Sequence, residues 1–441
     1  MKKSLKLLSI LFLILICTLL FASCGDSEEN QKPEYDGEVI ELNVFNWGEY
    51  ISDGFEDSLD TNAAFEEYFL QKFGKRVKVN YSTYATNEDM YSKLSSGAGS
   101  YDIVIPSDYM IDKMIKEDML IPFGADSIEN YKNISDEFKN LYYDPQNRYS
   151  VPYTYGMLGI IYNSALVDEQ DVADESWGLL WNEKYKGKIL QFNNPRDAFG
   201  SAMYYKGIDV NSTDKSDWDA ALTLLSNQKP LIQAYVNDEI FNKMATASAA
   251  IAPYFAGDFI TMASENEDLR FYYPKEGSNL FVDAMCIPKS SKNIDVAKEY
   301  INFMLSPEPA IANAVYIGYA SPNKVVVESE EYAEAMEELT EGAMDILYGK
   351  SHVDVNAEYI EKFGKNSYCY ESFSPEIQEH VNVLWESLKT ENSTELWVHI
   401  TTLIIVVAVL MLAVYTKVVE KSRSRDYRMR DKMKKTAKAQ K

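Results

Sequence analysis

Three short runs near the start of the chain alternate apolar and polar residues, and each run ends in a loop rich in aromatic and polar side chains. The runs cover residues 40–44, 77–81 and 103–105, and segments with helical spacing separate them. This pattern predicts a β-α-β-α-β unit with parallel strands. Ligands bind at the carboxyl edge of such a sheet. We therefore expect the loop residues after the strands to converge: Trp47, Tyr50, Tyr84, Ser107 and Tyr109.

The first segment between these strands shows a well-defined helical pattern. From Thr61 to Phe73 the apolar side chains recur largely on one face. Gly74 follows and favours the left-handed conformation that ends many helices. We therefore expect a helix over residues 61–73.

The same succession of strand and polar loop returns in the middle of the chain. Strands are predicted at 188–192, 249–252 and 281–288, and helices at 198–205 and 294–305. An extended apolar and aromatic run precedes them and predicts a crossover between two parts of the fold: residues 151–162.

Residues 38–393 are too many for one compact core, so this segment predicts two α/β lobes joined by hinge strands. We expect the first lobe to cover 38–152, with 284–325 returning to it. The second lobe should cover 153–283, with 326–393 packed on it. Lobes of this kind close around a ligand at their interface.

The N-terminus has the pattern of an export signal. Three lysines precede an apolar stretch at 7–21, and Ala22-Ser23-Cys24 follows. Small residues before a cysteine resemble a bacterial lipobox, which implies cleavage after residue 23 and lipidation of Cys24. An uncleaved anchor helix would give the same topology. The polar stretch 24–37 predicts a flexible tether.

A second membrane segment is predicted near the C-terminus. Residues 396–415 carry no formal charge and are long enough to span a bilayer, with Trp397 and Tyr415 at the two ends. Eleven Lys and Arg face three Asp and Glu in the tail, residues 417–441. The positive-inside rule places this tail in the cytoplasm and the preceding domain outside. A buried core helix is the alternative for 396–415.

Charge and composition narrow the range of functions. The formal net charge of −25 enriches cations at the surface and disfavours nucleic acid, although acidity often serves solubility alone. Cys286 and Cys369 remain in the mature domain, and their spacing does not decide whether they pair. We find no metal-ligand cluster, no nucleophile with a base and no phosphate loop. The sequence therefore predicts a protein that is not an enzyme and needs no cofactor or metal.

An ordered set of motifs between about residues 40 and 325 resembles one known family. The motifs include Asn46-Trp47-x-Glu49-Tyr50, Tyr101-Asp102-Ile103-Val104-Ile105-Pro106-Ser107-x-Tyr109, Pro274-Lys275-Glu276-Gly277 and Ile317-Gly318-Tyr319-x-Ser321-Pro322-Asn323. Together they are similar to the spermidine/putrescine-binding proteins of bacterial ABC importers. The resemblance implies a two-lobed periplasmic-binding-protein-like fold. It also implies a receptor that captures a polyamine outside the membrane and delivers it to permease subunits, with ATP hydrolysis on separate subunits.

The resemblance also implies which side chains contact the ligand. Carried over position by position, the contacts are Trp47, Glu49, Tyr50, Ser107, Tyr109, Asp197, Tyr254, Phe281, Asp283 and Tyr319. The chain departs from the family pattern at four positions. Gly48 replaces a hydroxyl residue, Asn194 replaces a carboxylate, and Tyr254 and Phe281 stand where the family usually has Trp. These departures leave open the choice between putrescine, spermidine and another diamine.

The chemistry of a polyamine matches these residue types. Its ammonium groups require carboxylates, and its methylenes pack on aromatic faces. We expect Asp283 to pair with an ammonium in the middle of the cleft, because a carboxylate inside an apolar strand is costly without a partner. Asp197 and Glu49 should meet the charged ends. The rings of Trp47, Tyr254 and Phe281 should enclose the methylenes, with four side chains at the periphery: Tyr50, Ser107, Tyr109 and Tyr319.

Each of these assignments has a structural alternative. An Asp near the start of a helix, such as Asp197, is often an N-cap. Tyr254 and Phe281 are equally consistent with ordinary core residues, and Glu49 with a solvated loop residue. At the level of function, the alternatives are a binding protein for another cationic or neutral solute and a membrane-anchored sensor that signals through the tail.

Overall fold

The computed structural model describes residues 37–55, 58–365, 367–390, 402–412 and 415–417. The predicted export signal, Cys24, nearly all of the tether and most of the basic tail lie outside the described residues. Only part of the predicted span 396–415 is described, and that part is helical. Among the described residues, no helix has both the length and the apolar character needed to cross a bilayer.

Within the described residues, one mixed sheet of nine strands runs through the molecule in the order β2-β1-β3-β9-β4-β7-β5-β6, and β8 pairs with β4. β1 pairs in parallel with both β2 and β3, which confirms the parallel unit expected at the start of the chain. The strands are β1 (Ile40–Trp47), β2 (Val77–Tyr84), β3 (Ile103–Val104), β4 (Ser150–Asn163), β5 (Ile189–Phe192), β6 (Ile232–Val236), β7 (Ile251–Phe255), β8 (Leu269–Tyr272) and β9 (Leu280–Cys286).

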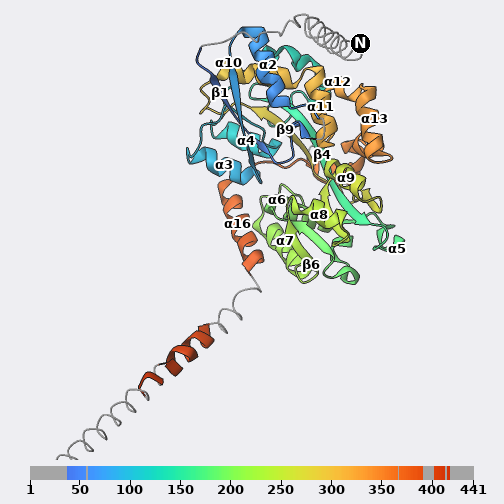
Figure 1. The fold of residues 1–441 in the computed structure, drawn as a ribbon. Helices are drawn as coiled ribbons and strands as arrows, with labels where there is room; N and C mark the ends of the chain where they lie inside the picture. Colours follow the sequence, from blue (N-terminus) through green and yellow to red (C-terminus); the bar gives the residue numbers. More distant parts are fainter. Residues whose placement is uncertain (1–36, 56–57, 366, 391–401, 413–414, 418–441) are drawn as a thin grey trace, which may run out of the picture.

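β4 connects the two lobes (Figure 1). Its first half, from Ser150 to Met157, pairs with β9, which also pairs with β3. Its second half, from Leu158 onward, pairs with β7 and β8 instead. The apolar run 151–162 is therefore one continuous strand, and the predicted crossover is confirmed.

The helices cover the sheet on the two lobes. Buried residues of α2 (Thr61–Phe73), α3 (Asn87–Ser95), α4 (Asp108–Lys116) and α10 (Ile294–Met304) belong to the first core. The second core includes residues of α5 (Glu169–Val172), α6 (Pro195–Lys206), α7 (Lys215–Gln228), α8 (Glu239–Ala245), α9 (Ala256–Glu265), α12 (Lys324–Val327), α13 (Glu330–Leu339), α15 (Ala357–Phe363) and α16 (Pro375–Thr390). α11 (Pro307–Ile317) contributes to both cores, and α14 (His352–Val355) has no buried residue.

Helix α2 has the limits expected from the sequence. The Asp60 side chain accepts a hydrogen bond from the Ala63 N–H at its start. Gly74 ends it at φ 63°, and the Gly74 N–H donates to the carbonyl of Leu70. The predicted helix and its glycine C-cap are confirmed.

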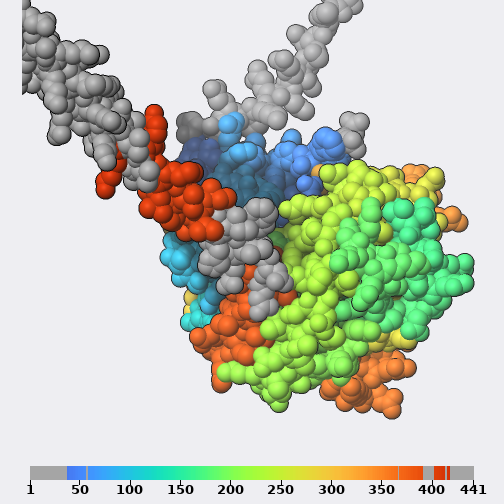
Figure 2. Space-filling model, turned by 90° about the horizontal axis from the view of Figure 1, so that it is seen from below, coloured from blue at the N-terminus to red at the C-terminus, as the bar shows by residue number. Residues whose placement is uncertain are grey.

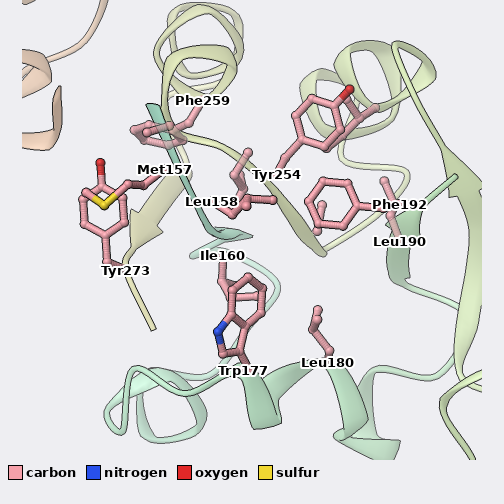
Figure 3. Packing of buried hydrophobic residues seen from close by; sticks show 14 of the residues in the cluster. Met157, Leu158, Ile160, Trp177, Leu180, Leu190, Phe192, Tyr254, Phe259 and Tyr273 are labelled. Carbon is pink, nitrogen blue, oxygen red and sulfur yellow. The ribbon is translucent and has the colours of Figure 1, made fainter. Parts of the chain in front are cut away.

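Each lobe has a hydrophobic core of its own. In the second lobe, Trp177 and Leu180 lie under β4, and Phe192 and Tyr254 face each other across the neighbouring strands (Figure 3). Each large side chain that is fully buried contributes roughly 1.5–3 kcal/mol to folding. The cores meet along β4 and β9 rather than at one residue, so the lobe limits given above stay predictions.

A short segment after α15 touches both lobes; we call residues 367–373 the strap. On the second lobe, Tyr204 Oη donates to the carbonyl of Tyr368 (3.0 Å). On the first lobe, Ser372 Oγ donates to Asp112 Oδ2 on α4 (2.5 Å). The strap leads into α16, which packs against α7. In Figure 2, orange segments of the C-terminal region lie against the cyan part of the first lobe and the green second lobe.

Candidate functional site

A cleft between the lobes brings the predicted ligand contacts together. The space within it amounts to about 990 Å³, part of it open to solvent. Every position carried over from the resemblance lines this cleft: Trp47, Glu49, Tyr50, Ser107, Tyr109, Asp197, Tyr254, Phe281, Asp283 and Tyr319. Residues from both lobes and from the shared strand β9 therefore face one space.

Asp283 lies on β9 and is only 4% exposed. Its Oδ2 accepts a hydrogen bond from Tyr50 Oη (2.7 Å), and Tyr50 Oη also lies 2.5 Å from Thr154 Oγ1. Among the described residues, no donor meets Oδ1 in hydrogen-bond geometry. Burial raises the pKa of Asp283 to about 6, while the hydroxyls of Ser107 and Tyr50 act in the opposite direction. Oδ1 of this carboxylate therefore has no hydrogen-bond partner among the described residues, although the Ser107 hydroxyl lies near the carboxylate.

Asp197 is the third residue of α6, and it is not the N-cap. Asn194 caps the helix, because its Oδ1 accepts from the Asp197 N–H (2.8 Å). Asn194 Nδ2 in turn donates to Asp197 Oδ2 (2.9 Å). The capping alternative is therefore wrong for Asp197. Burial raises its pKa to about 6.

Three acidic side chains that the sequence did not predict also line the cleft: Glu88, Asp238 and Asp258. Asp258 accepts from Tyr319 Oη (2.8 Å), and burial raises its pKa to about 7, with Asp238 adding repulsion. Glu88 accepts from Tyr109 Oη (3.0 Å), and burial raises its pKa as well.

The sequence contained a signal for two of these three residues. Glu88 lies in the first turn of α3, the helix that follows the predicted strand at 77–81, and Asp258 lies in the first turn of α9, after the predicted strand at 249–252. Asp238 follows β6, a strand that we did not predict. Most of β6 is half-buried and lacks a clear apolar run.

Aromatic rings surround the acidic groups. Phe281 lies 5.2 Å from Phe255 and 6.0 Å from Tyr319, both centroid to centroid and edge to face. Tyr254 stacks on Phe192 at 5.6 Å (Figure 3). Phe255, Phe192 and Tyr370 also line the cleft, and sequence reasoning did not assign them. The cleft therefore combines carboxylates with aromatic faces.

Tyr84 lies behind this ring lining rather than in it. Its ring packs on Trp47 at 4.7 Å, and both Tyr84 Oη and Trp47 Nε1 donate to the carbonyl of Ile105 (2.7 and 2.9 Å). Tyr84 therefore lies beside Trp47, as the expected convergence of the loops requires, although it does not line the cleft. Its hydroxyl donates within the first lobe, and its ring packs against that of Trp47.

Arg196 is the one basic side chain that lines the cleft among the described residues. Its guanidinium stacks on Phe373 (3.9 Å) and Tyr370 (4.3 Å), and Nη2 donates to Asn211 Oδ1 (2.8 Å) and to the carbonyl of Glu371 (3.2 Å). These contacts tie α6 to the strap through Nη2 and the guanidinium face, whereas Arg196 Nε and Nη1 have no hydrogen-bond partner among the described residues.

The electrostatic balance of the cleft follows from these side chains. Six carboxylates face one arginine: Glu49, Glu88, Asp197, Asp238, Asp258 and Asp283. The described residues contain no group of three or more His, Cys, Asp or Glu side chains suited to a metal ion, and Cys286 and Cys369 are both free. Two α/β lobes that share their central strands and enclose an acidic, aromatic cleft define a two-lobed solute-binding protein.

Comparison with known proteins gives the family. The chain matches the bacterial extracellular solute-binding proteins over residues 63–340. The chain belongs to this family. It is 34% identical to the spermidine/putrescine-binding periplasmic protein of Escherichia coli K12 over 283 residues, which are 64% of this chain and 77% of that protein. It is 28% identical to the putrescine/cadaverine-binding protein of Pseudomonas aeruginosa, over 64% of this chain and 79% of that protein.

Solved structures agree with this assignment. A putative spermidine/putrescine ABC transporter protein from Listeria monocytogenes aligns with a TM-score of 0.63 at 34% identity, covering 79% of this chain and 99% of that one. A spermidine/putrescine ABC transporter substrate-binding protein from Streptococcus pneumoniae aligns with a TM-score of 0.61 at 35% identity, over 79% and 98%. The resemblance found in the motifs is confirmed. The family binds solutes and is non-enzymatic, which agrees with the prediction that the chain is not an enzyme.

Proposed function

We propose that this protein captures a polyamine, spermidine or putrescine, in the cleft between its lobes and delivers it to an ABC permease. The observation that carries this proposal is the buried Asp283, whose Oδ1 has no hydrogen-bond partner among the described residues. A buried carboxylate oxygen without a donor is costly, and an ammonium group of a ligand supplies three donors.

The composition of the cleft supports a ligand with more than one positive charge. Its six carboxylates repel one another, and burial raises the pKa of Asp197, Asp258 and Asp283. A cation that enters the cleft offsets both the repulsion and the burial. A charge-assisted hydrogen bond contributes roughly 1.5–3 kcal/mol, and an ammonium on a ring face contributes ~0.5–2 kcal/mol.

The order of side chains along the cleft supports an alkyl chain between the charges. Phe281 lies two residues from Asp283 on the same strand, and its ring meets those of Phe255 and Tyr319. An aromatic surface beside a carboxylate suits a polyamine, because its methylenes can pack on the rings while an ammonium group meets the carboxylate. In this proposal Asp283 binds an ammonium group beside the ring of Phe281, and Asp197 and Glu49 face other charges of the ligand.

The names of the relatives support the same ligand class. The proteins from Escherichia coli and Pseudomonas aeruginosa are named for binding spermidine and putrescine, or putrescine and cadaverine. The structural relatives from Listeria and Streptococcus are named as spermidine/putrescine ABC transporter proteins. Delivery to permease subunits, with a separate ATPase, follows for this chain by the same relationship.

We also propose that the protein acts at the outer face of the membrane, anchored by a lipid on Cys24 and by a helix over 396–415. The lipobox-like Ala22-Ser23-Cys24 and the basic tail support this arrangement. So do the helical residues 402–412, whose apolar side chains are largely exposed. Removal of residues 396–441 alone should leave the protein in the membrane fraction, and replacement of residues 1–24 by a cleavable export signal as well should release it.

Calorimetry on the full-length protein tests the ligand assignment. We expect spermidine or putrescine to bind with 1:1 stoichiometry, and arginine and maltose to give no heat. Arginine is the matched control, because it is cationic but carries a carboxylate that the acidic cleft repels. Binding of maltose or arginine without binding of a polyamine would assign the cleft to a different solute.

A further inference from the structure

Asn279 occupies a place in the cleft that neither the motifs nor the resemblance assigns. It immediately precedes β9, and it lines the cleft together with Phe281 and Asp283, whereas Leu280 and Val282 do not. Alternate residues of an extended strand face the same side. Asn279, Phe281 and Asp283 therefore form one row along the cleft, with a phenyl ring between two polar side chains.

The two ends of this row lie toward different lobes. Asp283 is opposite Thr154 on β4 and forms a bridge with Ser107 of the first lobe. The carbonyl of Asn279 accepts from the N–H of Leu158, where β4 begins to pair with β7 of the second lobe. At about 3.3 Å per residue, the two positions are roughly 13 Å apart along the strand. This separation is comparable to the length of an extended triamine.

The Asn279 side chain has an unused acceptor. It is 2% exposed, and its Oδ1 has no hydrogen-bond partner among the described residues. Asp283 Oδ1, at the other end of the row, also has no hydrogen-bond partner among the described residues. A buried carbonyl oxygen without a donor costs free energy, and most such groups in folded proteins are paired. Two unpaired acceptors in one ligand cleft therefore point to two donors on the ligand.

We propose that Asn279 Oδ1 accepts a hydrogen bond from an ammonium group at the second-lobe end of the cleft, and so selects for ligand length. This inference rests on the polyamine-binding function proposed above. A triamine such as spermidine spans from Asp283, past the ring of Phe281, to Asn279. Putrescine is too short to reach both positions, and it is held at Asp283.

Calorimetry with spermidine and putrescine on the full-length Asn279→Ala protein tests this assignment. Loss of a hydrogen bond to a charged group should weaken spermidine binding roughly tenfold or more, with putrescine changed less than about twofold. Putrescine binding then also shows that the variant is folded. The nearly isosteric Asn279→Asp variant should bind spermidine more tightly than the parent. Asn242→Ala, at an exposed position on α8, is the control and should change neither ligand.

Three results would overturn the inference. They are equal weakening of both ligands in Asn279→Ala, weakening of putrescine alone, or no change in either ligand together with no gain in Asn279→Asp. If the parent protein itself binds neither polyamine, the proposed function fails before Asn279 is tested. The two failures are therefore distinguishable.

Discussion

At the scale of single residues, the proposed ligand contacts depend on which carboxylate oxygens in the cleft already have a hydrogen-bond partner and which do not. The sequence predicted Asp283 because a carboxylate stands inside an apolar strand, and the structure places it in the cleft with Oδ1 unpaired. It did not predict Glu88 or Asp258, because acidic residues in the first turn of a helix are common for reasons of capping and dipole, nor Asp238, which follows the unpredicted strand β6 at the N-cap of α8. Only the fold shows that these three face the same space.

Asp283→Asn should weaken polyamine binding at least about thirtyfold. The amide keeps the shape but leaves the ammonium unpaired, which costs on the order of 2–5 kcal/mol. Calorimetry against the parent measures this. Asp295→Asn, at an exposed position on α10, is the matched control and should bind as the parent does. An Asp283→Asn protein within about threefold of the parent would remove Asp283 from its proposed role.

Polyamine affinity should fall as the pH is lowered from about 8 to about 5. Burial raises the pKa of Asp197 and Asp283 to about 6 and that of Asp258 to about 7, so these groups bind protons across this range when no cation is present. A bound cation favours their charged form, so binding releases protons near neutral pH. Calorimetry in buffers of different ionisation enthalpy measures that release. Affinity that is independent of pH would contradict the proposed role of these carboxylates.

The same three carboxylates, Asp197, Asp258 and Asp283, should make the ligand-free protein less stable as the pH rises. Their pKa values are higher in the folded protein than in the unfolded chain, so the folded state binds more protons. Their contribution to stability is therefore greatest below the unfolded pKa, near pH 4, and is lost as the pH rises through about 6 to 7. The shift in Tm caused by the ligand should accordingly grow over this interval.

At the scale of elements, the sequence predicted those strands and helices whose apolar pattern is complete. Helix α2 and the long strand β4 are examples, because their buried faces repeat with a clear period. β6 and β8 were missed, since β6 is mainly half-buried and β8 has only four residues with Arg270 exposed among them. The strap was beyond prediction, because its partners, such as Asp112 and Tyr204, lie more than a hundred residues away in sequence.

The start of α9 and the ring of Tyr319 approach so closely that only glycine fits at position 257. A Cβ there would lie 2.3 Å from Tyr319 Cδ2. Gly257→Ala should therefore lower the free energy of unfolding by roughly 1–3 kcal/mol. It should also weaken polyamine binding, because displacement of the ring breaks the Tyr319–Asp258 hydrogen bond. Chemical denaturation and calorimetry measure the two effects.

Gly48→Ala is the control for this variant. A Cβ at Gly48 meets Asp238 Oδ2 at 3.4 Å, which is an ordinary contact, so the free energy of unfolding should change by less than about 0.5 kcal/mol. If the two substitutions changed the free energy of unfolding equally, the close contact between Gly257 and Tyr319 would not be a constraint on the fold of the cleft.

At the scale of the whole molecule, the two lobes and their shared strands place acidic groups from distant parts of the chain around one space. The motifs predicted this arrangement, and the family assignment and the structure agree with the two-lobed fold. Which of these side chains contact the ligand stays a prediction.

A crystal structure grown with a mixture of spermidine and putrescine tests whether Asp283 binds an ammonium group inside the cleft. We expect an extended polyamine in the cleft, with an ammonium within hydrogen-bond distance of Asp283 Oδ1 and its methylenes against Phe281. A polyamine bound outside the cleft, or in the cleft without contact to Asp283, would contradict this expectation.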